Sequence, residues 1–226
     1  MRLGVLYSGG KDSCLALHMA SERDTVAGLV TIRSRNPESY MFHTPDVHLA
    51  RLHAESMGLP IIERETAGVK EEELSDLEAA VERARLEWGI EGIVTGAVAS
   101  RYQADRVRRI CDGLGLASVN PLWGADQLWL LGELLRLRFE VMVVGVFAPP
   151  LDGSWLGRVL DARMVEELAA LQRAHGINPA GEGGELETTV LWAPRFSRRV
   201  EVVRASKREG PTSAVLLVEE ARLADA

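Results

Sequence analysis

A glycine-rich segment near the N-terminus is the strongest chemical signal in the sequence. The run SGGKDS at 8–13 follows a short apolar stretch, Leu3–Tyr7, and precedes a stretch of good helix formers. Glycines at a strand-to-helix turn let backbone N–H groups close around an anion, and the helix N-terminus and the lysine charge strengthen the attraction. The sequence therefore predicts a phosphate-binding loop. The alternative is a plain Gly-Gly turn followed by a solvated lysine.

This loop differs from a Walker A loop, because Val5 and Asp12 stand where that pattern requires Gly and Ser or Thr. It resembles instead the PP-loop of the ATP pyrophosphatases, which cleave ATP between the α- and β-phosphates. The resemblance implies nucleotide contacts from the whole run, that is from Ser8, Gly9, Gly10, Lys11, Asp12 and Ser13.

Two residues of this loop are predicted to be catalytic. Lys11 would neutralise charge that develops on the leaving pyrophosphate. Asp12 would hold Mg²⁺, because magnesium favours one or two carboxylates together with phosphate oxygens. The alternative for Asp12 is capping of the helix that follows.

A second polar segment, 95–103, also follows a strand-like stretch and precedes a helix. It should therefore lie beside the first loop, at the carboxyl edge of the sheet, where open α/β sheets bind ligands. We expect Gly96 and Ser100 to contact the nucleotide, and Arg101 and Gln103 to contact the substrate. The alternative is a simple link between a strand and a helix.

Two further segments are candidates for substrate binding. The run GEGGELET at 181–188 predicts an acidic loop, because three glycines with three carboxylates disfavour helix and strand. Its Glu182, Glu185 and Glu187 could bind a cation, a metal or a positively charged substrate, whereas a solvated hinge is the alternative. In the aromatic segment 39–43, Tyr40 and His43 could line a pocket or pack in the core.

The remaining cysteines and histidines favour structural roles. Cys14 has no recognisable base partner, so packing within its helix is favoured over nucleophilic chemistry, and Cys111 fits an apolar helix face. Two distant cysteines without a CxxC pair indicate a reducing cytoplasm. His48 and His53 are interpreted as surface or packing residues.

Composition narrows the class of protein. The chain has 226 residues, 46% of them hydrophobic and 26% charged, which is ordinary for a globular protein with a sizeable core. A formal net charge of −7 makes a broad nucleic-acid surface improbable. Because no run of 18 apolar residues occurs and no signal peptide is recognisable, we expect a cytoplasmic protein that does not enter membranes.

Strand and helix signals alternate through the first two thirds of the chain. This alternation predicts an α/β fold with a doubly wound parallel sheet over residues 1–148, including a last strand at 140–146. After the turn-rich segment 148–153, one helix and three strands predict a smaller α+β lobe over residues 149–226, which we expect to bind substrate.

Six motifs in register resemble the diphthine–ammonia ligase family and cover nearly the whole chain. They are SGGKDS at 8–13, SYMFH at 39–43, GAVASRYQADRV at 96–107, PLW at 121–123, SWLGR at 154–158 and GEGGELET at 181–188. The resemblance implies an adenine-nucleotide alpha-hydrolase-like fold of the HUP type. Leu186, where an aromatic residue is common in the family, is the one departure noted.

The family resemblance also implies a reaction and its partners. ATP would adenylate the free carboxylate of diphthine on translation elongation factor two, and ammonium would supply the nitrogen of the amide. Diphthine carries a trimethylammonium group, which aromatic faces and carboxylates could hold. The candidates for that pocket are Tyr40, Trp123, Trp155, Glu182 and Glu185. A homodimer is a further expectation.

Three other functions remain open from the residues alone. The first is a PP-loop enzyme that modifies tRNA, which the acidic composition and the lack of a cysteine pair disfavour. The second is an ATP-binding protein without turnover. The third is a related amidase that acts on a different carboxylate.

Overall fold

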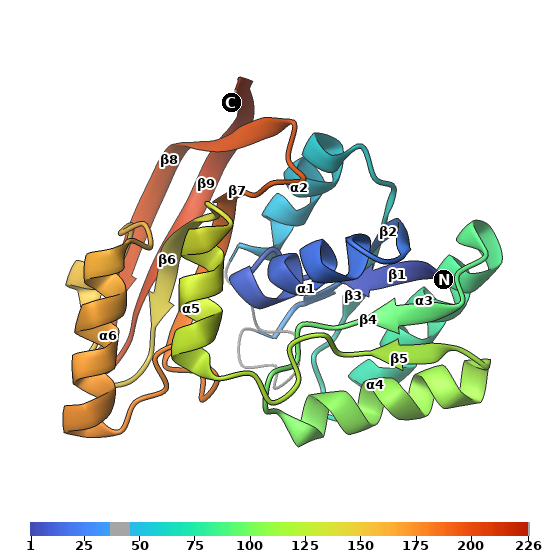
Figure 1. Cartoon of the computed structure of the whole chain (residues 1–226), viewed down its shortest axis with the longest axis horizontal. Coiled ribbons are helices and arrows are strands. Elements are labelled where there is room, and N and C mark those ends of the chain that lie inside the picture. Colours follow the sequence, from blue (N-terminus) through green and yellow to red (C-terminus); the bar gives the residue numbers. More distant parts are fainter. Residues whose placement is uncertain (37–45, 226) are drawn as a thin grey trace. The chain divides into compact units, whose positions relative to one another are not determined.

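The structure is a computed structural model that describes residues 1–36 and 46–225. The chain divides into two compact units, Met1–Trp123 and Gly124–Ala226 (Figure 1). Each unit has its own sheet, parallel in the first and antiparallel in the second. The units are therefore described one at a time.

The first unit alternates strands and helices as the sequence predicts. In chain order its elements are β1 (Arg2–Leu6), α1 (Lys11–Ser21), β2 (Thr25–Ser34), the 3₁₀ helix η1 (Val47–Leu49), α2 (Ala50–Met57), β3 (Ile61–Thr66), α3 (Glu73–Trp88), β4 (Gly92–Val94), α4 (Arg101–Leu114) and β5 (Ala117–Val119). The strands form one sheet in the order β3-β2-β1-β4-β5, and every pair is parallel. The predicted doubly wound parallel sheet is confirmed.

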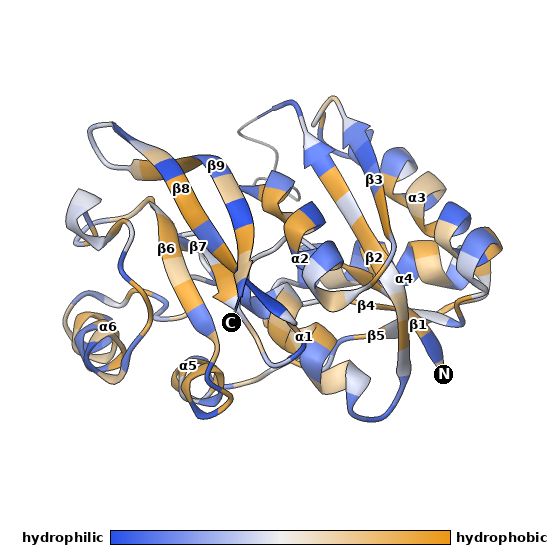
Figure 2. Cartoon of the chain, turned by 90° about the horizontal axis from the view of Figure 1, so that it is seen from above, coloured by the Kyte–Doolittle hydropathy of each residue, from blue (hydrophilic) through white to orange (hydrophobic). Residues whose placement is uncertain are grey.

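The strand order determines which face each helix covers. The chain steps from β1 to β2 and β3 in one direction and to β4 and β5 in the other. Because such crossovers are right-handed, α1 and α2 lie on one face and α3 and α4 on the opposite face (Figure 2).

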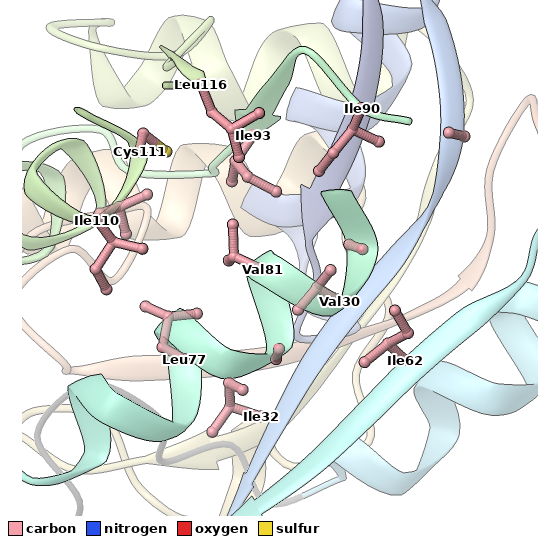
Figure 3. Packing of buried hydrophobic residues seen from close by; sticks show 14 residues of the cluster. Val30, Ile32, Ile62, Leu77, Val81, Ile90, Ile93, Ile110, Cys111 and Leu116 are labelled. Atoms are coloured by element: carbon pink, nitrogen blue, oxygen red, sulfur yellow. The ribbon is translucent and has the colours of Figure 1, made fainter. Parts of the chain in front are cut away.

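Both faces of this sheet are buried, as a parallel sheet requires. Seven consecutive residues of β2, from Val26 to Ile32, are buried. On the face covered by α3 and α4, apolar side chains of both helices pack against β2, β3 and β4 (Figure 3). Leu77, Val81 and Ala84 of α3 are buried as the helical spacing predicts, whereas Leu74 is only half-buried.

The second unit is an α+β arrangement. Its elements are α5 (Gln127–Arg136), β6 (Glu140–Val146), the 3₁₀ helix η2 (Gly153–Trp155), α6 (Ala162–His175), β7 (Leu186–Trp192), β8 (Arg198–Glu209) and β9 (Ala214–Asp225). The strands pair in the order β7-β6-β9-β8 and are antiparallel throughout, while α5 and α6 pack against each other. The predicted smaller α+β lobe is confirmed.

The structure differs from the sequence prediction in where the second unit begins. We expected a boundary at 148/149, whereas the division falls between Trp123 and Gly124, so that α5 and β6 belong to the second unit. β6 pairs antiparallel with β7 and β9 and is no part of the parallel sheet. A short buried apolar strand looks the same in either kind of sheet, since the pattern of its residues carries no information on direction.

Two other features were missed or underestimated. The three-residue strand β5 was not predicted at all. The hairpin strands β8 and β9 have 12 residues each and extend well beyond the segments 199–205 and 214–219 that the sequence predicts as strands. Across residues 1–36 and 46–225, no helix is long and apolar enough to cross a bilayer.

Candidate functional site

The glycine-rich loop connects the carboxyl end of β1 to the first residue of α1. The Oγ atoms of Ser8 and Ser13 lie 3.2 Å apart, and the Ser13 hydroxyl donates to the Gly10 carbonyl at 3.0 Å. Ser8 Oγ accepts from the Gly10 amide at 3.3 Å. Gly9 has φ of +85°, a conformation that favours glycine. The two serines thus close the turn through hydrogen bonds within the loop.

This loop lies at the point where the sheet changes its winding. β1 and β4 are neighbouring parallel strands, yet α1 and α4, which follow them, lie on opposite faces of the sheet (Figure 2). The segments that leave the two strands therefore diverge, and open α/β sheets bind ligands in the crevice between such segments.

Gly96 brings the segment after β4 against the start of α1. A Cβ on Gly96 would lie 2.6 Å from the Ser13 amide nitrogen and 2.7 Å from the Asp12 carbonyl carbon. The two predicted segments are therefore in contact at this edge. The close approach that requires glycine is that of the α1 backbone, whereas the sequence prediction assigned it to a nucleotide.

The N-terminus of α1 has no side-chain cap. Its N-cap is Gly10, which has no side chain to accept hydrogen bonds from the first turn. In α4, by contrast, the Ser100 hydroxyl accepts from the Gln103 amide at 3.4 Å. The first N–H groups of a helix need acceptors from outside the helix, and their positive dipole end attracts anions. A phosphate supplies such an acceptor.

Lys11 and Asp12 form an ion pair at this N-terminus. The Lys11 ammonium lies 2.8 Å from Oδ2 of Asp12, and the Lys11 side chain is almost completely buried. The other carboxylate oxygen, Oδ1 of Asp12, is buried without a hydrogen-bond partner among the described residues. An unsatisfied buried carboxylate oxygen is costly, so this atom fits a cation.

The donor set suits magnesium better than a metal held by protein alone. Among the described residues, no group of three or more His, Cys, Asp or Glu side chains could hold an ion. Mg²⁺ is commonly held by one or two carboxylates together with substrate phosphates and water. Asp12 beside a helix N-terminus without a side-chain cap fits that requirement.

Three buried side chains lie next to the loop: Tyr7, Cys14 and His53. The sequence alone did not indicate a part in the site for any of them. All three are buried, and the Tyr7 hydroxyl lies 3.1 Å from Nδ1 of His53. Burial raises the pKa of the Cys14 thiol to about 12, although a hydrogen bond with Tyr7 opposes that shift. Cys14 therefore stays a thiol at neutral pH, which agrees with its predicted packing role.

The other predicted residues of segment 95–103 differ in their exposure and in their contacts. Ser100 caps α4, which is the structural alternative considered for this segment, while Arg101 is exposed and Gln103 half-buried. The neighbouring Tyr102 contacts two charged side chains. Its hydroxyl donates to Glu71, in the segment before α3, at 2.9 Å, and the Arg106 guanidinium stacks 3.3 Å from the ring centroid.

The acidic loop belongs to the second unit and is held by one of its own carboxylates. Glu185 accepts from the Asn178 amide at 3.1 Å and from the Gly183 amide at 2.9 Å. Glu182 and Glu187 are half-buried, and Glu187 lies within β7. The structure thus gives Glu185 a structural function that the composition of the loop did not reveal.

The aromatic candidates differ in their accessibility. Trp155 is buried, and the Arg158 guanidinium lies 4.4 Å from the centre of its ring, so one aromatic face already has a cation. Trp123, at the end of the first unit, is 46% exposed. Tyr40 and His43 lie outside the described residues.

Comparison with known proteins covers both units. The diphthamide synthase N-terminal domain family matches residues 1–118, and the diphthamide synthase C-terminal domain family matches residues 126–223. The human protein named diphthine–ammonia ligase is 32% identical over 222 residues, which cover 89% of this chain and 83% of that protein. The zebrafish (Danio rerio) protein of the same name is 33% identical over 219 residues, covering 88% and 86%.

A solved structure gives a looser likeness. It is titled as a predicted subunit of tRNA methyltransferase from Methanocaldococcus jannaschii. It is 18% identical with a TM-score of 0.45, and the match covers 86% of this chain and 98% of that one.

Proposed function

This chain belongs to the diphthine–ammonia ligase family, ligases that form carbon–nitrogen bonds, and we propose that it converts diphthine on translation elongation factor two to diphthamide. In the proposed reaction ATP activates the diphthine carboxylate as an acyl-adenylate, and ammonia then forms the amide. AMP and pyrophosphate are the other products.

One structural observation carries the nucleotide part of this proposal. A glycine-rich loop and a helix N-terminus without a side-chain cap meet the second loop at the winding change between β1 and β4. Backbone N–H groups at such a place bind the phosphates of ATP. This binding does not depend on which substrate group the ATP then activates.

The proposed chemistry proceeds in two balanced steps. A carboxylate oxygen of diphthine attacks the α-phosphorus, the bond from that phosphorus to the bridging oxygen breaks, and pyrophosphate leaves. The amides of the loop and the Lys11 ammonium stabilise the charge that develops on pyrophosphate. Ammonia, formed when ammonium loses a proton, then attacks the acyl carbon. AMP leaves with the carboxylate oxygen, and the nitrogen loses a second proton.

Asp12 would hold the magnesium ion, which when bound would neutralise charge on the phosphates. Oδ2 of Asp12 pairs with Lys11, so the carboxylate also fixes the position of the lysine ammonium. The two neighbouring residues would therefore both help to hold the triphosphate, Lys11 through its own charge and Asp12 through the magnesium ion.

Residues of both units are proposed to contact the protein substrate. Arg101 is exposed at the first turn of α4, and Gln103 follows in the same turn. Glu182 would supply a carboxylate for the trimethylammonium group, and Glu187 is a further candidate for substrate binding in the second unit. Cation recognition by carboxylates and aromatic faces supports this assignment.

Isotope labelling tests the whole reaction. The protein would be incubated with elongation factor two that carries diphthine, ATP, Mg²⁺ and ammonium containing heavy nitrogen. We expect the heavy nitrogen in the protein product, read by mass spectrometry of the modified peptide. When the diphthine carboxylate carries heavy oxygen, one labelled atom should appear in AMP.

The labelled product also separates the alternatives. Heavy oxygen in inorganic phosphate would indicate an acyl phosphate and contradict adenylation. ATP binding without any hydrolysis, or AMP formation stimulated by tRNA in place of the elongation factor, would overturn the assignment of substrate.

A further inference from the structure

Tyr7 is the last residue before the glycine-rich loop, and three elements fix it. Its amide donates to the Val30 carbonyl at 2.9 Å, and its carbonyl accepts from the Thr31 hydroxyl at 2.8 Å. Both partners belong to β2. The backbone is therefore held by the sheet, and the side chain is free to connect the loop to other elements.

The Tyr7 side chain connects α1 with α2. Its hydroxyl lies 3.1 Å from Nδ1 of His53, which belongs to α2, and the two rings meet edge to face at an interplanar angle of 89°. The Cys14 thiol, in the first turns of α1, also interacts with this hydroxyl. A phenol can donate one hydrogen bond and accept others, so it can serve both neighbours at once.

His53 also contacts the loop directly. A Cβ on Gly9 would lie 3.3 Å from Cε1 and 3.4 Å from Nδ1 of the imidazole. The ring therefore fills the space beside Gly9, the residue whose φ of +85° turns the chain into the loop. His53 has no exposed surface, so its position is fixed by this packing.

We propose that His53 is a positioning residue that holds the glycine-rich loop in its phosphate-binding conformation, through its hydrogen bond to Tyr7 and its packing against Gly9. It does not touch the nucleotide; it acts through the residue that precedes the loop and the residue that turns it. An aliphatic side chain could fill much of the volume but would leave the buried Tyr7 hydroxyl with one partner fewer. The effect of His53 on the conformation of the loop does not depend on the proposed function, whereas its effect on ATP binding rests on that proposed function.

Hydrogen exchange in the ligand-free protein tests the effect on the loop. In His53→Leu, we expect the amides of residues 9–11 to exchange faster than in the wild type. His53→Asn keeps a polar atom close to the position of Nδ1, so it should restore part of the protection. Val81→Ala is the matched control, because Val81 is buried in the core on the opposite face of the sheet and should lower the melting temperature without changing exchange in the loop.

Calorimetry with a non-hydrolysable ATP analogue and Mg²⁺ tests the consequence. His53→Leu and Tyr7→Phe should each weaken binding by about fivefold to tenfold, the cost of a lost buried hydrogen bond. The double variant should lose less than the product of the two factors, because both changes remove the same bond. In turnover, KM for ATP should rise while KM for ammonium stays unchanged.

The results of these experiments decide for or against the proposed role of His53. Unchanged exchange in His53→Leu, or the same increase in Val81→Ala, would overturn it, as would losses in the double variant that multiply fully. If the wild type fails to bind the analogue, the proposed function fails, while the exchange experiment still decides the positioning of the loop.

Discussion

Gly96, in the segment after β4, has no room for a side chain, because a Cβ there would lie 2.6 Å from the amide nitrogen of Ser13 in the first turn of α1. The contact joins the two loops that leave the sheet at its change of winding. The position of the helix N-terminus thus depends on a residue that is far away in the sequence.

Gly96→Ala should therefore displace the start of α1 or the segment after β4. Because the obstructing atoms belong to the backbone, we expect a loss of about 1–3 kcal/mol in the free energy of unfolding, together with weaker ATP binding. Gly113→Ala is the control, since a Cβ on that helical glycine would meet nothing within 4 Å. It should stabilise α4 by about 0.5–1 kcal/mol. Equal urea midpoints for the two variants would contradict the contact.

Lys11→Ala should abolish most catalysis while the protein stays folded. Removal of one preorganised charge at a transition state typically lowers kcat by about 100- to 1000-fold. We expect this loss in the release of AMP and pyrophosphate, with an unchanged far-ultraviolet circular dichroism spectrum. Turnover within a factor of about two of the wild type would remove Lys11 from the mechanism.

Asp12→Asn should raise the concentration of Mg²⁺ needed for half-maximal activity. The amide keeps an oxygen for the Lys11 ammonium but loses the charge of the buried Oδ1. A rise of about tenfold corresponds to about 1.4 kcal/mol. Asp105→Asn is the matched control on the surface of α4, where the carboxylate pairs only with Arg108 among the contacts identified. A parallel shift in both variants would contradict a specific role for Asp12.

Much of the fold could be predicted because local signals mark most elements. The αL glycines that end α2, α3 and α4, at positions 58, 89 and 115, are readable directly from the sequence. The partner of a strand is not a local property, which is why β6 was assigned to the wrong sheet. A strand of three residues such as β5 is too short for a periodic pattern.

The candidate site divides in the same way. The glycine-rich loop could be placed at a strand-to-helix turn because its six residues are consecutive and follow a short apolar run. His53 could not be assigned to the loop, since its contacts with Tyr7 and Gly9 arise only when α2 packs against the sheet. The backbone hydrogen bonds of Glu185 were hidden for a related reason, because composition shows a carboxylate but not its acceptor geometry.

Alkaline pH should destabilise the first unit through Cys14. Burial raises the pKa of this thiol from 9.0 to about 12, so the stabilisation is complete below pH 9 and is lost as the pH rises from 9 towards 12. In that range the unfolded chain releases the proton and the folded protein keeps it. Burial likewise raises the pKa of Cys111 to about 11.

Cys14→Ala isolates the contribution of this thiol. Its free energy of unfolding should fall less steeply above pH 9 than that of the wild type, by about 1.4 kcal/mol per pH unit. Urea unfolding at several pH values measures both slopes. Parallel slopes for the two proteins would show that the Cys14 thiol does not keep its proton on folding.

The acidic loop of the second unit allows structural and recognition roles to be separated. Glu185→Ala removes the acceptor for the Asn178 and Gly183 amides, so we expect faster hydrogen exchange at both and a loss of about 1–3 kcal/mol in stability. Glu182→Gln should raise KM for the protein substrate, because it removes one of the charges proposed to face the trimethylammonium group. Amidation that falls in Glu185→Ala but is unchanged in Glu182→Gln would contradict recognition by Glu182 and leave the loop a structural element.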